Sequence, residues 1–443
     1  MTLQAHCAAV LHYTASSSAD LLSTHAFQPH YFPDGALVID TDSGRVVACG
    51  DAESVLVNYP GIDIHAYDNA LIMPGMIDTH IHYPQVDVIA SYGEQLLDWL
   101  NNYTFPAEQA FADEQYAAAT ADFFLDELAR NGTTTALVFG TVHPQSVDAF
   151  FSASHQRNMR MICGKVMMDR NAPHALCDTA ESSLTQSREL IERWHGKGRQ
   201  QYAVTPRFAI TSTREQLDVA GQLLTEYPTV TLQTHLAENL DEIAFVEELF
   251  PERASYLDVY DYYGLLGPRS VFAHGVHLTD TDYQRLSESG SHLAFCPTSN
   301  LFLGSGLFRL HKQPHPVSVG LASDVGGGTS MSMLQTLSEA YKICQLNGTS
   351  LSAHEAFYRV TQGNAQVLGL DHCIGSFNSG NEADFIVLDL NATPLMQRRQ
   401  STCHTLEERL FALMVLGDDR AIAVTFVAGQ CLYRKVSNKE LSN

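Results

Sequence analysis

The sequence predicts an α/β protein, a (β/α)8 TIM barrel carrying a small β-sandwich domain built from the N- and C-terminal segments. Three observations predict this fold. The chain has 443 residues, which exceeds a typical single core of about 100 to 200 residues but fits one large barrel with an attached domain. Apolar runs of strand length alternate with helical segments through the middle of the chain. Short β-rich stretches occupy both ends.

The two ends of the chain share a pattern that predicts one β domain. Residues 36–50, ALVIDTDSGRVVACG, indicate two strands joined by an Asp-Ser-Gly turn. Residues 383–390, ADFIVLDL, and residues 421–435, AIAVTFVAGQCLYRK, are again rich in β-branched residues. We therefore expect three parts: residues 1–73 as the first part of the sandwich, 74–380 as the barrel, and 381–443 as the rest of the sandwich plus a terminal helix.

Eight apolar runs in the middle of the chain predict the barrel strands. They are MIDTHIHY, TTTALVFG, RMICGKVMMD, QYAVTPRFA, TVTLQTHLAE, SVFAHGVHL, HLAFCPTSN and PVSVGLASD, near residues 76, 133, 160, 201, 229, 270, 292 and 316. Segments between them, such as DEQYAAATADFFLDELARNG, have apolar residues at helical spacing, an acidic start and a closing Asn-Gly. In such a barrel the active site lies at the carboxyl ends of the strands.

Composition and charge exclude several classes of protein. The formal net charge of −24, with no basic stripe, argues against a nucleic-acid partner. The nine cysteines are odd in number and contain no C-x-x-C pair, which is typical of reduced thiols. The N-terminus lacks a signal-peptide pattern, and no apolar run reaches the roughly 18 to 20 residues that span a bilayer. We expect a cytoplasmic protein without a membrane partner.

Histidines and an aspartate at the predicted strand ends indicate a metal site. His80 and His82 are two apart, so a strand places both on one face. His235, His274 and Asp324 close other strands. Each of these three alone is better explained by an ordinary hydrogen bond or a helix cap. Together they lie at the same end of strands one, five, six and eight, and the combination predicts a catalytic metal ion, for which imidazole is a preferred zinc ligand.

Other titratable residues lie near these strand ends. Glu238 follows His235 by three residues and suits a proton donor for the substrate nitrogen. Its alternative interpretation is the solvated start of a helix. His143, His277 and Lys165 are better explained as structural residues than as ligands. A carboxylated Lys165 would bridge two metals, but the fourth strand holds no lysine, so we expect a single ion.

Several segments resemble the amidohydrolase superfamily in order and spacing from about residue 70 to 385. They are PGMIDTHIH, HLAE, FAH, CPTSNLFLGSG and SDVGGGTSMSM. Within that superfamily, HYPQVDVIASYGEQLLDWLNNYTFPAE (residues 82–108) is similar to guanine deaminases, and NGTTTALVFGTVHPQS and GKVMMDRNAP are similar to their bacterial forms. Two departures are small: Ser323 stands where related enzymes often have threonine, and His277 is a histidine that some members lack.

The resemblance implies hydrolytic deamination of guanine to xanthine and ammonia by a homodimer. It implies one zinc ion per chain, held by His80, His82, His235, His274 and Asp324. It also implies that Glu238 and Asp324 carry protons. The implied substrate-binding residues are His82, Gln85, Arg207, Phe208, His235, Glu238 and Asp324. An amide and a guanidinium match the carbonyl and ring nitrogens of an oxopurine, and an aromatic face stacks on its ring. A barrel-rim salt bridge is the alternative for Arg207.

The sequence leaves two alternative functions open. The same metal site could act on 8-oxoguanine, a pterin or a triazine, although the long first loop favours guanine. A non-catalytic assembly protein of the same superfamily is the alternative from another class, and such a chain would be expected to lose ligands. The H-x-E and P-C-x-x-C motifs of the deaminases that act on polynucleotides are missing from the sequence.

Overall fold

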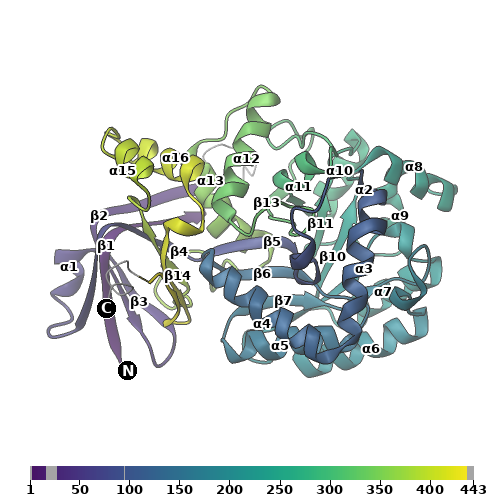
Figure 1. Ribbon diagram of the computed structural model, residues 1–443, viewed down its shortest axis with the longest axis horizontal. Coiled ribbons are helices and arrows are strands. Elements are labelled where there is room, and N and C mark those ends of the chain that lie inside the picture. Colours follow the sequence, from purple (N-terminus) through teal and green to yellow (C-terminus); the bar gives the residue numbers. More distant parts are fainter. Residues whose placement is uncertain (1, 16–26, 94, 437–443) are drawn as a thin grey trace.

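The computed structural model describes residues 2–15, 27–93 and 95–436. It consists of a barrel and a second, smaller sheet beside it (Figure 1). Among the described residues, no helix is long and apolar enough to cross a membrane. The predicted α/β architecture, a (β/α)8 barrel with a small β domain contributed by both ends of the chain, is confirmed.

The barrel contains all eight predicted strands in sequence order. Neighbouring strands are parallel, and the short β8 (Val166–Met167) pairs with β9. The strands are β5 (Met76–His82), β6 (Thr133–Phe139), β7 (Arg160–Gly164), β9 (Gln201–Pro206), β10 (Thr231–Leu236), β11 (Ser270–His274), β12 (His292–Phe295) and β13 (Ser318–Leu321). Parallel strands joined by helices put all their carboxyl ends on one side, so the ends of these strands form the mouth of the barrel.

Helices connect the strands and cover the outside of the barrel (Figure 1). The segment predicted at 113–132 forms α4, where Asp113 Oδ1 caps the helix by accepting from Gln115 N (2.8 Å) and Tyr116 N (2.9 Å). The helices of this part are α2 (Leu96–Trp99), α3 (Phe105–Gln109), α4 (Glu114–Arg130), α5 (Pro144–Gln156), α6 (Ala180–Trp194), α7 (Arg214–Glu226), α8 (Leu240–Leu249), α9 (Tyr256–Tyr262), α10 (Asp280–Ser289), α11 (Pro297–Phe302), α12 (Met333–Leu346), α13 (Ala353–Tyr358) and α14 (Asn364–Val367).

A buried asparagine joins the first and last barrel strands. Asn364 Nδ2 donates to Ile77 O (2.6 Å) and Leu321 O (2.8 Å), and its Oδ1 accepts from Leu321 N (2.9 Å). Nearer the mouth, Asp324 N donates to His80 O (3.0 Å). Buried backbone groups need such partners, so Asn364 satisfies the seam where the strand order begins and ends.

The second sheet combines strands from both ends of the chain. Its order is β16-β15-β14-β4-β1-β2-β3, and only the β1–β4 pair is parallel. The strands are β1 (Leu3–Ala15), β2 (Phe27–Asp40), β3 (Arg45–Asp51), β4 (Asp63–Pro74), β14 (Phe385–Asp389), β15 (Ile422–Val427) and β16 (Gln430–Arg434). Its helices are α1 (Ala52–Leu56), α15 (Pro394–Gln400) and α16 (Leu406–Leu416). The last two precede β15 and β16. We expected a terminal helix within residues 381–443, and the last of these residues, 437–443, lie outside the described part of the chain.

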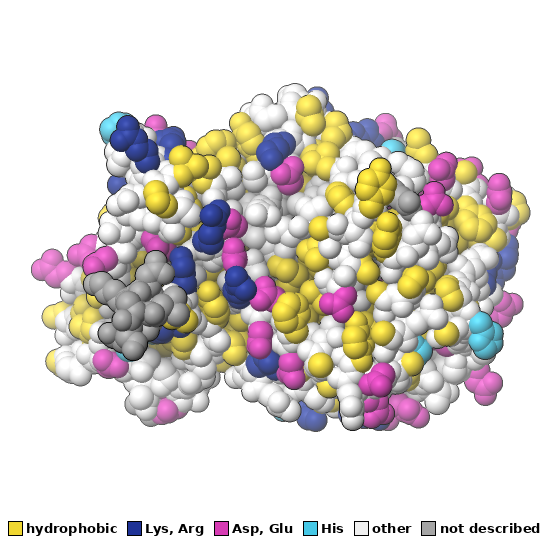
Figure 2. All heavy atoms as spheres, viewed as in Figure 1, with side chains coloured by type: hydrophobic (Ala, Val, Ile, Leu, Met, Phe, Trp, Pro, Cys, Tyr) yellow, Lys and Arg dark blue, Asp and Glu magenta, His cyan; other side chains and the backbone are white. Residues whose placement is uncertain are grey.

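An ion-pair network connects the end of the barrel opposite the mouth to the segment that precedes β14. Glu382 accepts from Arg160 Nε (2.7 Å) and from Arg199 Nη2 (2.6 Å), and Arg199 also pairs with Asp384. Burial by itself raises the pKa of Glu382, but the two arginines outweigh it and lower the pKa to about 2 from 4.5. On the face shown in Figure 2, basic side chains (dark blue) lie next to acidic ones (magenta) where the small β domain meets the barrel.

We expect Glu382→Gln to lower the free energy of unfolding at pH 7 by about 3 kcal/mol, because it leaves the buried guanidinium of Arg199 and the partly buried one of Arg160 short of a charge partner. The folded-state pKa is depressed, so this contribution is present above about pH 4.5 and is lost as the pH falls toward 2. Urea denaturation should therefore show a smaller difference in the free energy of unfolding between wild type and variant at pH 4 than at pH 7. Glu339→Gln, which removes a surface pair with Lys342, is the control and should cost less than about 1 kcal/mol.

Candidate active site

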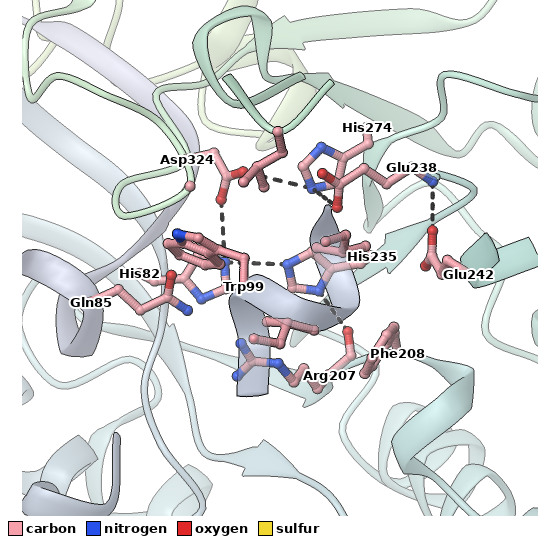
Figure 3. Close-up of a pocket in the computed structure, with 14 residues that line it drawn as sticks. His82, Gln85, Trp99, Arg207, Phe208, His235, Glu238, Glu242, His274 and Asp324 are labelled. Atoms are coloured by element: carbon pink, nitrogen blue, oxygen red, sulfur yellow. Dashed lines mark hydrogen bonds and ion pairs between the residues drawn. The ribbon is translucent and has the colours of Figure 1, made fainter. Parts of the chain in front are cut away.

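The predicted ligand residues meet at the mouth of the barrel. Figure 3 shows four of them, His82, His235, His274 and Asp324. His80 and His82 end β5, and their ring centroids lie 4.9 Å apart. His235 lies in β10, His274 ends β11, and Asp324 follows β13. His80, His82, His274 and Asp324 are buried, and His235 is half-buried. The strand-end argument from the sequence therefore places these residues together.

Two of these residues have a backbone conformation that the sequence does not reveal. His274 has φ 72° and Asp324 has φ 51°, both in the left-handed region. Ala237, which precedes Glu238, has φ 47°. Such residues cost about 1 to 3 kcal/mol each and cluster at active sites, where the surrounding structure holds them. The chain thus leaves the strand direction at three places around the mouth.

Four residues offer ligand atoms within 4.8 Å of one another: His80, His235, His274 and Asp324. His82 is close to three of them. Its Nε2 atom lies 3.2 Å from Nε2 of His80, 3.2 Å from Nε2 of His235 and 3.4 Å from Oδ1 of Asp324. The group has the composition of a metal site, with imidazole nitrogens and one carboxylate.

Hydrogen bonds made by Nδ1 of two histidines determine that their Nε2 atoms face the group of possible ligands. His235 Nδ1 donates to Arg207 O (2.7 Å), and His274 Nδ1 donates to Asn300 Oδ1 (2.9 Å). The Nε2 atoms of both rings therefore carry lone pairs, and that of His274 is buried without a hydrogen-bond partner among the described residues. Metal-binding histidines are oriented in this way. Nitrogen lone pairs that face one another in a buried site repel unless a cation lies between them, so this arrangement suits a bound metal ion.

Burial controls the protonation of the cluster. It lowers the pKa of His80 and His235, and it lowers the pKa of His82 to about 3. Burial also acts to raise the pKa of Asp324, but hydrogen bonding and the charge of His80, with smaller contributions from His82 and His274, hold it well below its ordinary value. At neutral pH the imidazoles of His80, His82 and His235 are therefore neutral and the Asp324 carboxylate is ionised, which are the forms that bind a metal.

Glu238 lies beside this cluster and is only 2% exposed, so it is not the solvated helix start that its position could also have indicated. Its Oε1 accepts from Ser305 Oγ (2.9 Å), and its Oε2 lies 3.3 Å from His274 Nε2. Burial and the Asp324 carboxylate raise the pKa of Glu238 to about 8. Glu242 holds the turn by accepting from Glu238 N (2.8 Å). A carboxyl group with such a pKa can hold a proton at neutral pH and release it to a substrate.

A pocket opens in front of the cluster. Gln85 and Arg207 lie on one side of it, and Glu238 lies on the other (Figure 3). Phe208 contributes an aromatic face, and the segment that follows β5 contributes an apolar cover of Leu96, Trp99 and Leu100. The pocket therefore combines an aromatic and apolar lining with polar groups on two sides, as expected for a heteroaromatic ring.

The family model for the amidohydrolase family matches residues 71–432. The chain belongs to the amidohydrolase family. A guanine deaminase of Escherichia coli strain K12 is 55% identical over 407 residues, which cover 91% of this amidohydrolase and 92% of that protein.

Two solved structures are similar along their whole length. The E. coli guanine deaminase has a TM-score of 0.94 and 52% identity, with 98% of this chain and 100% of that chain covered. A guanine deaminase from C. acetobutylicum, with guanine bound in its active site, has a TM-score of 0.86 and 30% identity, with 97% and 100% covered.

Three residues that the sequence indicates to be structural lie outside the group of residues that could hold a metal ion. Lys165 forms a buried ion pair with Asp178. His277 Nε2 donates to Ser305 O (2.7 Å). His143 precedes α5, and its Nε2 is buried without a hydrogen-bond partner among the described residues. None of the three belongs to the group of four ligand residues.

Sequence reasoning missed Glu108, a wholly buried residue that contacts two side chains of the pocket wall. Its Oε1 accepts from both Gln85 Nε2 (3.0 Å) and Arg207 Nη1 (2.8 Å). Arg207 is therefore paired inside the pocket, not in a salt bridge on the barrel rim. The available signal was a lone carboxylate in the mainly apolar segment FPAEQAF, because a charge that is buried needs a partner.

Proposed function

We propose that this amidohydrolase is a guanine deaminase, which hydrolyses guanine to xanthine and ammonia. One observation carries the proposal: a single buried pocket combines the histidine and aspartate cluster with Glu238 at one end and Gln85 and Arg207 at the other. The similar proteins named guanine deaminase support the same assignment.

The proposed cofactor is one zinc ion per chain, held by His80, His82, His235, His274 and Asp324. Neutral imidazoles and an ionised carboxylate suit zinc. When bound, zinc lowers the pKa of water to about 7 and thereby supplies hydroxide at neutral pH.

The side chains of the pocket have distinct proposed tasks in binding. Arg207 and Gln85 bind the edge of the purine that carries the carbonyl group. Phe208 lies against the ring. This orientation turns the carbon that bears the amine toward Asp324 and Glu238, and it keeps the reacting atoms away from bulk water because Trp99 and its neighbours cover the pocket.

Asp324 and Glu238 move the protons of the proposed reaction. Water adds through its oxygen to the carbon that bears the amine, and Asp324 accepts one water proton. Glu238 donates its proton to the adjacent ring nitrogen. Asp324 then passes its proton to the amine, which leaves as ammonia, while Glu238 recovers a proton from the new hydroxyl as that group becomes a carbonyl. The residues end in the state in which they began.

The test is ammonia release from a panel of guanine, adenine, 8-oxoguanine, pterins and triazines. We expect guanine to be the best substrate and adenine a poor one, because adenine presents an amine where Arg207 and Gln85 require a carbonyl. Arg207→Ala should lower kcat/KM for guanine at least tenfold, about the value of one lost charged hydrogen bond, and leave the metal content unchanged. Comparable turnover of adenine would contradict the proposal, and preference for another ring would identify the alternative substrate. The homodimer and the cytoplasmic location remain predictions.

A further inference from the structure

We propose that Glu108 is a positioning residue that sets the hydrogen-bonding pattern of the pocket, so that an oxo group and not an amino group is accepted at the ring edge facing Gln85 and Arg207. This inference rests on the proposed function and deepens it. The family resemblance of the sequence implies that Gln85 and Arg207 bind the substrate, whereas Glu108 acts through both of these residues.

Glu108 connects two residues that come from different barrel strands. It lies in α3 and is wholly buried. Gln85 follows β5, and Arg207 follows β9. Glu108 Oε1 accepts from Gln85 Nε2 (3.0 Å) and Arg207 Nη1 (2.8 Å), and its Oε2 accepts from Arg207 Nη1 (2.9 Å). One carboxylate therefore holds both polar side chains of this side of the pocket.

The carboxylate determines which way the Gln85 amide points. An ionised carboxylate accepts hydrogen bonds and cannot donate them, so the NH2 group of Gln85 must face Glu108. The other end of the amide is fixed as well, because Gln85 Oε1 accepts from Gly326 N (3.3 Å). Turning the amide over would place two acceptors against each other at Glu108 and two donors against each other at Gly326. The orientation of Gln85 is thus determined at both ends.

Glu108 also determines which donors of Arg207 remain for a ligand. The pair with Glu108 uses Nη1 alone, and Nε and Nη2 donate to no residue in the described part of the chain. The Arg207 carbonyl accepts from His235 Nδ1 (2.7 Å), which ties the backbone of Arg207 to a ligand histidine. Because the carboxylate balances the guanidinium charge, the pocket presents directed donors to a neutral ring.

Free guanidinium donors match a carbonyl oxygen and a ring nitrogen, and they oppose an amino group. The purine 2,6-diaminopurine keeps the reacting carbon and its amine but has an amino group in place of the carbonyl of guanine. The ratio of kcat/KM for guanine to that for 2,6-diaminopurine therefore measures the hydrogen-bonding pattern separately from the chemistry at the metal.

The experiment compares this ratio in wild type, Glu108→Gln and the control Glu114→Gln, an exposed glutamate at the start of α4. A glutamine at 108 can donate as well as accept, so the Gln85 amide and Arg207 lose their fixed arrangement. We expect Glu108→Gln to lower kcat/KM for guanine at least tenfold, mainly through KM, and to reduce the ratio at least tenfold, with full metal content. Glu114→Gln should match wild type.

Other outcomes separate the possible failures. If both substrates lose activity equally in Glu108→Gln and the ratio is unchanged, Glu108 has only a structural role and the inference is wrong. If wild type releases no ammonia from guanine, the proposed function itself is wrong. Should Glu108→Gln fail to fold, Glu108→Asp keeps a group that only accepts. We expect this variant to bind both substrates more weakly and to retain the guanine preference within about threefold, and loss of that preference would overturn the inference.

Discussion

Replacing Glu238 by glutamine is expected to lower the turnover number for guanine by at least two orders of magnitude. The substitution keeps the size of the side chain and its hydrogen bond to Ser305 but removes the proton that the reaction transfers. General acid–base catalysis of this kind is worth about a hundred- to ten-thousandfold. Steady-state turnover of guanine, measured on protein whose metal content has been determined, checks the prediction.

The matched control for this variant is Glu247→Gln, which changes an exposed glutamate on α8, the helix that begins just after Glu238. It should retain wild-type turnover. Glu238→Gln should also retain its metal, because Glu238 is not among the four grouped ligand residues. Near-normal turnover by the metal-replete variant would mean that another residue carries the proton.

Removing the metal is expected to abolish activity and to leave the fold intact. The ligands lie at the mouth of a barrel whose hydrophobic core extends through the strands and helices, so the ion is not needed to hold the chain together. Prolonged treatment with a chelator should reduce turnover to background with an unchanged circular dichroism spectrum, and added zinc should restore it. Elemental analysis of the active protein should give one ion per chain.

His235→Ala should bind the metal far more weakly and lose activity in parallel. His292→Ala is its control, because His292 begins β12 at the end of the barrel remote from the mouth. This control variant should still bind one ion per chain. Active protein without any transition metal would contradict the proposal. Iron or manganese in place of zinc would change only the identity of the ion, since such sites accept several metals.

Much of the fold could be predicted because it is encoded in local patterns. Each barrel strand is a short apolar run bounded by turn residues. Helix α4 shows its cap at Asp113, and Gly132, with φ 78°, follows its C-cap Asn131. The ligand residues were accessible for the same reason. His80 and His82 share a face through the two-residue period of a strand, and parallel strands bring their carboxyl ends together.

The contacts that position the residues of the pocket wall could not be predicted in this way. Glu108 contacts Arg207, which is 99 residues away in the sequence, and Glu238 contacts Ser305, which is 67 residues away. No periodicity relates such pairs, because their approach depends on how the loops between strands fold over the mouth. Burial is likewise a property of the whole molecule, and it is burial that raises the pKa of Glu238 to about 8.

The sequence by itself therefore determined the eight strands, the contribution of both chain ends to one β domain, and the types of residue at the mouth of the barrel, since these follow from repeats of two and of about 3.6 residues. Only the tertiary structure decided how those residues act. It set the left-handed backbone of His274 and Asp324, the Asn364 seam and the Glu108 carboxylate between Gln85 and Arg207. Each of these depends on contacts between distant parts of the chain, and such contacts form only when the barrel closes.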